Sequence, residues 1–85
     1  MPSYRVEIHV MPRPALLDPQ GRAVEHALRA LEFEGVGSVR MGKMLTLDLE
    51  ASDVSAARRD ATKMCERLLA NPVTEDFAVT VHEGP

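Results

Sequence analysis

The sequence predicts one α+β domain with the element order β-α-β-β-α-β, a ferredoxin-like antiparallel sheet with two helices on one face. Three observations support this class. Strict apolar–polar alternation predicts a strand near each end of the chain, helical spacing of apolar residues predicts two helices, and two short strand-like segments lie between the helices. With 85 residues the chain has room for a single domain, which we place at residues 1–85.

The first strand and the first helix have clear signals. Apolar and polar residues alternate over residues 4–10, which predicts a strand with one face exposed to solvent. Asp18 is expected to cap the helix by accepting hydrogen bonds from its first free amides, and Pro19 suits the first helical position. The apolar stripe of this helix consists of Val24, Ala27, Leu28 and Leu31. We expect the helix to stop near Glu34, with Gly35 as the residue that tolerates a positive φ.

The middle of the chain is expected to form a hairpin, with residues 38–41 and 44–50 as strands around a Gly-Lys dipeptide. A two-residue turn places Arg40 opposite Leu45, on the face of the inward leucines. An odd-length loop aligns Val39 with Leu45 instead and turns Arg40 outward, and we favour this register. In a third arrangement both faces of the hairpin are buried, and the outer face meets another chain through Val39, Met41 and Met44.

The second half of the chain predicts a helix followed by a strand. Ser52 or Asp53 is expected to cap the helix, which ends at Asn71 and Pro72. Its inward stripe consists of Val54, Ala57, Ala61, Met64, Cys65 and Leu68. Residues 77–82 alternate again and are expected to form the final strand of the sheet.

The composition excludes several classes of function. Charged residues make up 27% and hydrophobic residues 45% of the chain, which is typical of a folded domain rather than a disordered tail. The net charge of −3 argues against nucleic-acid binding, because a basic surface supplies most of that affinity. No apolar run approaches the ~20 residues that span a membrane, and the N-terminus resembles no signal peptide, so we expect a cytoplasmic location.

The inward apolar residues are few for a chain of this length. The free energy gained by burying them only marginally offsets the entropic cost of ordering the chain. Burial of further apolar surface against other chains would add stability. The sequence therefore favours assembly.

The residues that commonly carry chemistry form no recognisable site in the sequence. His9 and His82 lie on the polar sides of strands, and two histidines without a third ligand leave a metal site incomplete. Cys65 is interpreted as a small buried apolar residue, since no histidine lies at a spacing that would activate it. The acidic residues lack partners that would raise a pKa, and no glycine-rich phosphate loop is present. We therefore expect no catalytic, cofactor-binding or metal-binding residues in this chain.

Four segments have distinctive amino-acid sequences and follow one another along nearly the whole chain. They are residues 17–21 with 23–24, residues 33–36, residues 39–43 and residues 64–73. In these segments the chain resembles the PurS family, the small subunit of phosphoribosylformylglycinamidine (FGAM) synthase. Two positions depart from the family pattern, because Ala15 replaces a glycine and Glu32 stands where glycine often precedes Phe33. Both changes affect backbone geometry rather than reactive groups.

This resemblance implies a non-catalytic subunit. The full enzyme of the family converts formylglycinamide ribonucleotide, ATP, glutamine and water into formylglycinamidine ribonucleotide, ADP, phosphate and glutamate in de novo purine biosynthesis. A glutaminase subunit of PurQ type releases ammonia, and a large synthetase subunit of PurL type binds ATP and magnesium. Subunits of PurS type form homodimers or homotetramers, bridge the other two and support ammonia transfer. ATP, magnesium and glutamine would then be ligands of the partners, and this chain would bind no cofactor.

Six residues are candidates for contact with such partners. They are Leu17, Asp18, Gln20, Arg40, Gly42 and Lys43. Arg40 and Lys43 lie at the expected turn, where two cations could grip an acidic protein surface or a nucleotide phosphate. The alternative is a solvated turn whose charge blocks aggregation of sheet edges. Capping alone explains Asp18, whereas Gln20 in the first helical turn could also touch a partner.

The sequence alone also allows a second function, that of a stand-alone ferredoxin-like regulatory module that dimerises and binds a small metabolite between sheets. Such a module needs a polar, glycine-containing loop, for which residues 35–38 are the candidate. A hydrolase of acylphosphatase type needs an arginine in a glycine-rich loop after the first strand. Arg13 is present there, but the neighbouring prolines remove the amides that would bind phosphate.

Overall fold

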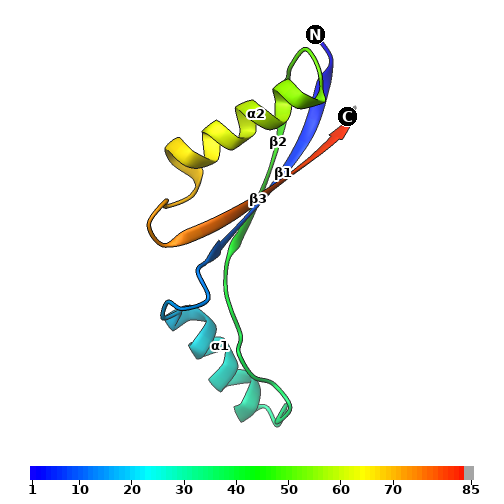
Figure 1. Cartoon of the computed structure of the whole chain (residues 1–85). Helices are drawn as coiled ribbons and strands as arrows, with labels where there is room; N and C mark the ends of the chain where they lie inside the picture. Colours follow the sequence, from blue (N-terminus) through cyan, green and yellow to red (C-terminus); the bar gives the residue numbers. More distant parts are fainter. Residues whose placement is uncertain (84–85) are drawn as a thin grey trace.

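The computed structural model describes residues 1–83, which form three strands, two α-helices and one π-helical turn (Figure 1). In chain order these elements are β1 (Ser3–Pro12), α1 (Pro19–Ala30), β2 (Lys43–Glu50), α2 (Val54–Met64), η1 (Cys65–Leu69) and β3 (Glu75–Glu83). The α+β class predicted from the sequence is confirmed, with the element order β-α-β-α-β.

The three strands form one antiparallel sheet with the order β2-β1-β3. Ile8 on β1 lies beside Leu45 on β2 and beside Val79 on β3, so apolar residues of all three strands share one face. This is the alternation that predicted the first and last strands. β1 therefore lies in the centre of the sheet, and β2 and β3 form its edges.

The expected hairpin is wrong, because residues 38–41 form no strand and the described part of the chain has three strands rather than four. These residues run from α1 to β2, and pairing with β1 begins only where Lys43 lies opposite Val10. The Gly-Lys dipeptide makes no turn. Neither the register of a two-residue turn nor that of an odd-length loop therefore applies. Hydrogen bonds of Arg40 and Met41 to the chain before α1 hold this segment beside that chain instead.

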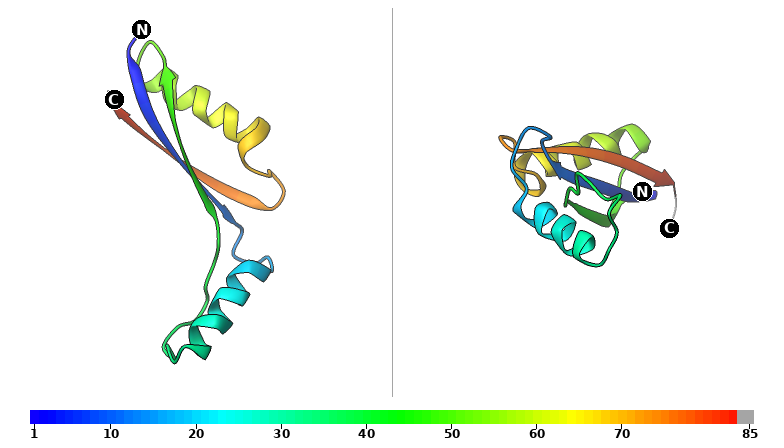
Figure 2. Two further views of the ribbon diagram at one scale, coloured as in Figure 1. Left: turned by 180° about the vertical axis from the view of Figure 1, so that it is seen from behind. Right: turned by 90° about the horizontal axis from the view of Figure 1, so that it is seen from below.

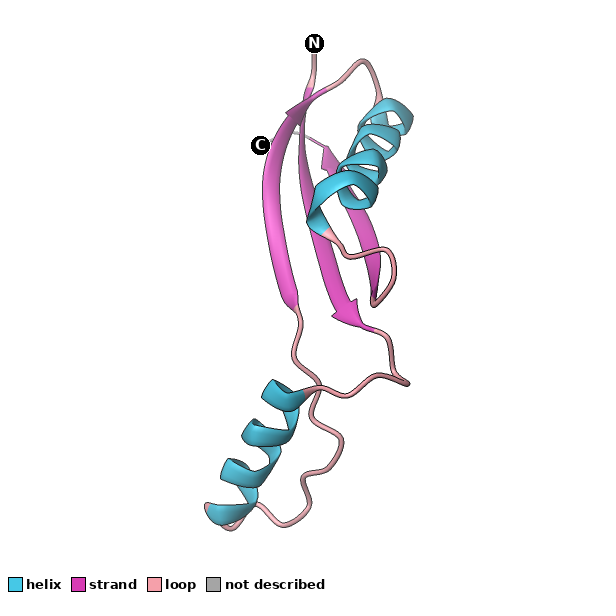
Figure 3. Ribbon diagram, turned by 90° about the vertical axis from the view of Figure 1, so that its left-hand side faces the viewer, coloured by secondary structure: helices cyan, strands magenta, loops and turns pink. Residues whose placement is uncertain are grey.

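The core lies between β1 and α2 with η1. Val6, Ile8 and Val10 on β1 are fully buried, as are Ala61 and Cys65 on the helical side. Burial confirms Cys65 as a core residue and raises the pKa of its thiol. In Figure 3, α2 lies over one face of the sheet, where it packs on β3 and β1. The inner side chains of both edge strands are only half-buried, and they are Leu45, Leu47, Leu49, Phe77, Val79 and Val81.

The expectation of two helices on one face is wrong for α1, which lies beyond one end of the sheet (Figures 1 and 2). The segments that lead into and out of α1 continue away from β1 and β2 and do not fold back over them. The molecule is consequently elongated, with extents of 51 × 28 × 14 Å. Its radius of gyration is 16.5 Å, compared with about 12 Å for a compact chain of this length.

The first helix also ends earlier than predicted. Its C-cap is Leu31, and the positive φ falls on Glu32 (75°) rather than on Gly35. The amide of Phe33 donates to the carbonyl of Leu28, and the amide of Glu32 donates to the carbonyl three residues before it. These are the paired hydrogen bonds of a Schellman motif. Glu32 thus takes a left-handed conformation for which glycine is better suited.

The second helix begins as predicted and ends differently. Asp53 is its N-cap and accepts a hydrogen bond from the amide of Ala56 at 2.8 Å. At the other end the helix widens into η1, and a π-helical turn shifts the positions that follow it around the helix axis. Leu68, an expected inward residue, is therefore 82% exposed, while Leu69 packs against the core.

Candidate functional site

Two segments connect α1 to the sheet, residues 13–18 and residues 31–42, and all six predicted interface residues lie in them or within two residues of them. They lie side by side next to the base of α1. We call the residues that hold them together the joint, which consists of Arg13, Asp18, Gly21, Arg40 and Met41. The contacts of the joint determine the direction in which α1 leaves the sheet.

Asp18 links the two segments through both of its carboxylate oxygens. Oδ1 accepts a hydrogen bond from the amide of Gly21 at 3.0 Å, which confirms Asp18 as the N-cap of α1. Oδ2 accepts one from the amide of Met41 at 2.7 Å, 23 residues further along the chain. The bond from Met41 and then that from Gly21 hold the pKa of Asp18 below its ordinary value, and the nearby charge of Arg40 lowers it further.

Arg40 is the second link of the joint. Its guanidinium donates to the carbonyl oxygens of Leu16 at 2.9 Å, Arg13 at 2.8 Å and Pro12 at 3.5 Å. A planar guanidinium with five N–H donors suits such a group of acceptors better than the single ammonium of a lysine. The half-buried side chain of Arg40 therefore binds its own chain and does not project from an exposed turn.

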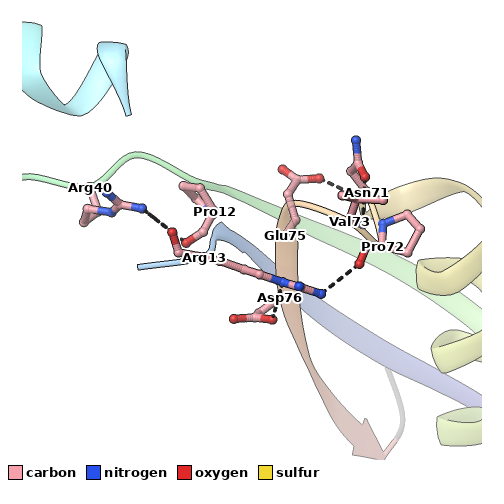
Figure 4. Close-up of polar contacts among 8 residues, drawn as sticks. All are labelled: Pro12, Arg13, Arg40, Asn71, Pro72, Val73, Glu75 and Asp76. Carbon is pink, nitrogen blue, oxygen red and sulfur yellow. Dashed lines mark hydrogen bonds and ion pairs between the residues drawn. The ribbon is translucent and has the colours of Figure 1, made fainter. Parts of the chain in front are cut away.

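Arg13 extends the joint to the loop that precedes β3 (Figure 4). Its guanidinium donates to the carbonyl of Pro72 at 2.8 Å and forms an ion pair with Asp76, with 3.4 Å between Nε and Oδ1. Its amide donates to the carbonyl of Thr74 at 2.9 Å. Because Arg40 binds the carbonyl of Arg13, a continuous series of polar contacts runs from the base of α1 to the loop before β3.

Two glycines allow the backbones to approach closely here. A Cβ on Gly21 would collide with the carbonyl oxygen of Val39 and with the carboxylate of Asp18. A Cβ on Gly42 would collide with the carbonyl oxygen of Val10. The distinctive string at residues 17–21 is thus explained by geometry, since it supplies a cap, a proline for the first helical position and a glycine at a close contact.

The six predicted interface residues fall into two groups. One group is engaged within the chain and consists of Asp18 and Arg40, together with Gly42, which is exposed but lies close to the carbonyl oxygen of Val10. The other group is exposed at the surface near the joint and consists of Leu17, Gln20 and Lys43. Leu17 is 70% exposed. Contact with a partner stays a prediction for all six.

An open hollow of about 570 Å³ lies beside the joint. Its walls are mainly apolar and include Pro14, Leu16, Leu17 and Val39. The charged residues in its lining include Asp18, Arg40 and Asp76, which already bind partners within the chain. The hollow therefore presents a mainly apolar surface beside the joint.

The other residues that could carry chemistry lie apart. Although β1 and β3 pair, the register places His9 opposite Ala78 and His82 opposite Arg5, so the two histidines are not neighbours. His82 instead lies near Glu7, with 3.5 Å between Nε2 and Oε1. Within residues 1–83, no three His, Cys, Asp or Glu side chains are grouped so as to hold a metal ion. In the same residues, no helix has the length and apolar character that crossing a membrane requires.

The variant Asp18→Asn is expected to keep the cap of α1 while losing the hydrogen bond from the amide of Met41. An asparagine still caps the helix through its carbonyl oxygen, but this single acceptor cannot also replace the carboxylate oxygen that binds Met41. We expect Asp18→Asn to accelerate hydrogen exchange of the Met41 amide while the Gly21 amide stays protected. Asp18→Ala should accelerate exchange of both amides.

The same bonds predict a pH dependence. Because the pKa of Asp18 is lowered in the folded state, its contribution to stability is complete above the ordinary aspartate pKa of about 4. That contribution is lost as the pH falls through the lowered value. The unfolding free energies of the parent and of Asp18→Asn should therefore converge on acidification, and curves that stay parallel would contradict the role of the ionised carboxylate.

Known proteins similar to this one match it over nearly its whole length. The PurS family model, described as phosphoribosylformylglycinamidine (FGAM) synthase, matches residues 5–83. Phosphoribosylformylglycinamidine synthase subunit PurS of Synechocystis sp. is 45% identical over 84 residues, which cover 96% of this chain and 84% of the relative. The subunit of the same name from Bacillus subtilis is 43% identical, with 94% of each chain covered. A solved structure of PurLQS from Thermotoga maritima contains a chain that is 36% identical, with a TM-score of 0.88 over 95% of this chain and 99% of the other.

Proposed function

The chain belongs to the PurS family of subunits of FGAM synthase, a glutamine-dependent ligase of purine biosynthesis, and from this premise we propose that it acts by assembly rather than by catalysis. Its role is to connect a glutaminase subunit with a synthetase subunit, so that ammonia released from glutamine passes between them without loss to water. Holding the two active sites together makes this transfer local rather than bimolecular.

The observation that carries this proposal is how the described residues use their reactive groups. Asp18 and Arg40 bind backbone groups of the chain itself, and Cys65 is fully buried. These contacts support a structural role for the groups that could otherwise take part in a reaction. ATP, magnesium and glutamine are accordingly assigned to the partner subunits, and none of them to this chain.

The partners are assigned by similarity to an assembled enzyme. The Thermotoga maritima structure to which the chain is similar is one of PurLQS. We place this chain in the corresponding position beside a synthetase of PurL type and a glutaminase of PurQ type, as a single domain working in the cytoplasm. The exposed residues near the joint are assigned to contact with these larger subunits, and they are Leu17, Gln20 and Lys43.

The shape of the chain supports more than one copy in the assembly. Its accessible surface is 5996 Å², whereas a compact chain of 9.4 kDa exposes about 5,000 Å². An elongated chain of this kind gains from covering the surplus surface with another copy. We therefore include a homodimer or homotetramer of this chain in the proposed function.

Native mass spectrometry of the chain mixed with a PurL-type synthetase and a PurQ-type glutaminase tests the connecting role. With glutamine and nucleotide present, we expect a complex that contains all three subunits. Omitting this chain should leave the two larger subunits separate. If they associate equally well without it, the proposal is wrong.

A further inference from the structure

We propose that His9, Met11 and Met44 form a binding site for a soft monovalent metal ion such as Cu⁺, on the face of the sheet opposite α2. This inference does not depend on the proposed function. The ligands are one imidazole nitrogen and two thioether sulfurs, and thioethers are soft donors that select Cu⁺ over harder cations. Within residues 1–83 the His, Cys, Asp and Glu side chains form no metal site among themselves, so methionine supplies the missing ligands.

The sheet brings the three ligands onto one face. α2 covers one face of the sheet, and the described residues place no helix over the other, which we call the outer face (Figure 3). Val10 of β1 is fully buried on the inner face, so its neighbours His9 and Met11 lie on the outer face. His9 pairs directly with Met44 of β2, which therefore lies on the outer face as well.

The spacing of these positions suits a shared ion. Residues directly opposite each other in an antiparallel pair have Cβ atoms about 4.5–5.5 Å apart, which is the relation of His9 to Met44. Residues two positions apart on a strand lie about 7 Å apart, which is the relation of His9 to Met11. A methionine side chain has three rotatable bonds and adapts to its surroundings. The two thioethers can therefore close on an ion beside the ring while the strands stay in place.

Gly42 determines where the sulfur of Met11 lies. A Cβ on Gly42 would collide with Sδ of Met11, so the sulfur occupies space that a side chain at this position would fill. Gly42 directly precedes β2 and lies two residues before Met44. The thioether of Met11 thus reaches from β1 toward β2, on the same side of β1 as Met44. The glycine prepares the site by making room for one of its ligands.

The three side chains are open to solvent. Met11 is 40% and Met44 59% exposed, and His9 is exposed too. Within residues 1–83 no ion pair engages His9, whereas Nε2 of His82 on the same face lies 3.5 Å from a carboxylate oxygen. The residue opposite His9 on β3 is the small Ala78, which leaves that side of the ring uncovered. An ion therefore reaches all three ligands directly from solution.

Titration of the full chain with Ag⁺ in chloride-free buffer tests the site, because Ag⁺ is a soft monovalent ion that needs no reductant. Competition with a chromophoric chelator then measures the affinity for Cu⁺ without oxygen. We expect one ion per chain. In NMR spectra the ion should shift the methyl signals of Met11 and Met44 and the ring signals of His9. The methyl signals of the other methionines serve as internal controls and should stay in place.

Met44→Leu removes one ligand while keeping an apolar side chain of similar volume, and His9→Gln removes the imidazole. Loss of a group that only supports a metal ligand already weakens binding about 10–100-fold, so we expect each variant to lose at least about tenfold in affinity. Met41→Leu is the matched control for methionine, since Met41 is also 40% exposed. His82→Gln is the control for histidine on the same face. Both controls should bind as the parent does, and circular dichroism checks the fold of every variant.

The thiol of Cys65 is the competing soft ligand, although it is fully buried. Binding that disappears in Cys65→Ala but persists in Met44→Leu would assign the ion to the thiol and overturn the inference. A parent chain without saturable binding of Ag⁺ or Cu⁺ would overturn it as well. Equally tight binding of Zn²⁺ would contradict the assignment to soft monovalent ions. None of these results bears on the connecting role, since they concern metal binding by this chain alone.

Discussion

Gly21→Ala is expected to destabilise the protein by about 1–3 kcal/mol, the range typical of extra atoms forced into a packed contact. The added Cβ would collide with the carbonyl oxygen of Val39, a backbone atom, and with the carboxylate of Asp18. Relief of the collision must move α1 away from residues 39–41 and so loosen the joint. In an unobstructed helix, alanine would instead be better than glycine by about 1 kcal/mol. Whether Gly21→Ala lowers or raises the free energy of unfolding therefore shows whether α1 lies in close contact with Val39.

Gly35→Ala is the matched control, because no atom lies within 4 Å of a Cβ at Gly35. A lower entropy of the unfolded chain predicts an effect between zero and a stabilisation of about 1 kcal/mol. Urea unfolding of both variants at one protein concentration gives the comparison and keeps any contribution from association equal. Equal stabilities of the two variants would contradict the close contact between α1 and residues 39–41.

The parts of the fold that depend on local signals could be predicted from the sequence. Alternation of apolar and polar residues located β1 and β3, because the side chains of a strand point to opposite faces in turn. Asp18 was identified as an N-cap and Asp53 as one of two candidates beside Ser52, since the amides that the two aspartates bind lie only three residues away. The family resemblance also depended on strings of neighbouring residues, and it is confirmed.

The position of α1 could not be predicted in the same way. An amphipathic helix needs an apolar surface to cover, but its sequence does not say whether that surface belongs to the same chain or to another. The expected hairpin failed for a related reason. Residues 38–41 read as a strand by composition, whereas contacts of Arg40 and Met41 with distant residues set their path. The end of α1 was misplaced because Glu32, rather than a glycine, takes the positive φ.

The long-range contacts of the joint gave no signal in the sequence. The second oxygen of Asp18 binds an amide 23 residues away, and no spacing rule reveals such a pair. Arg13 was considered only as a phosphate ligand, although its contacts are with the loop before β3. Gly21 belonged to the string that carried the resemblance, but its close contact with Val39 became evident only in the folded chain.

Omission of this chain from a reconstituted FGAM synthase is expected to have the largest effect. Without it, ammonia from a PurQ-type glutaminase must reach a PurL-type synthetase through bulk solution. We expect glutamine-dependent synthesis of formylglycinamidine ribonucleotide to fall by about tenfold or more, because the effective concentration of a tethered partner is lost. Synthesis from added ammonium should be unchanged, since the synthetase then takes ammonia directly from solution.

The ratio of the glutamine-dependent to the ammonium-dependent rate measures the connecting role directly. The ratio should be low for the two larger subunits alone and should recover when this chain is added. If the ratio is the same with and without the chain, the chain does not connect the two active sites and the proposed function is contradicted.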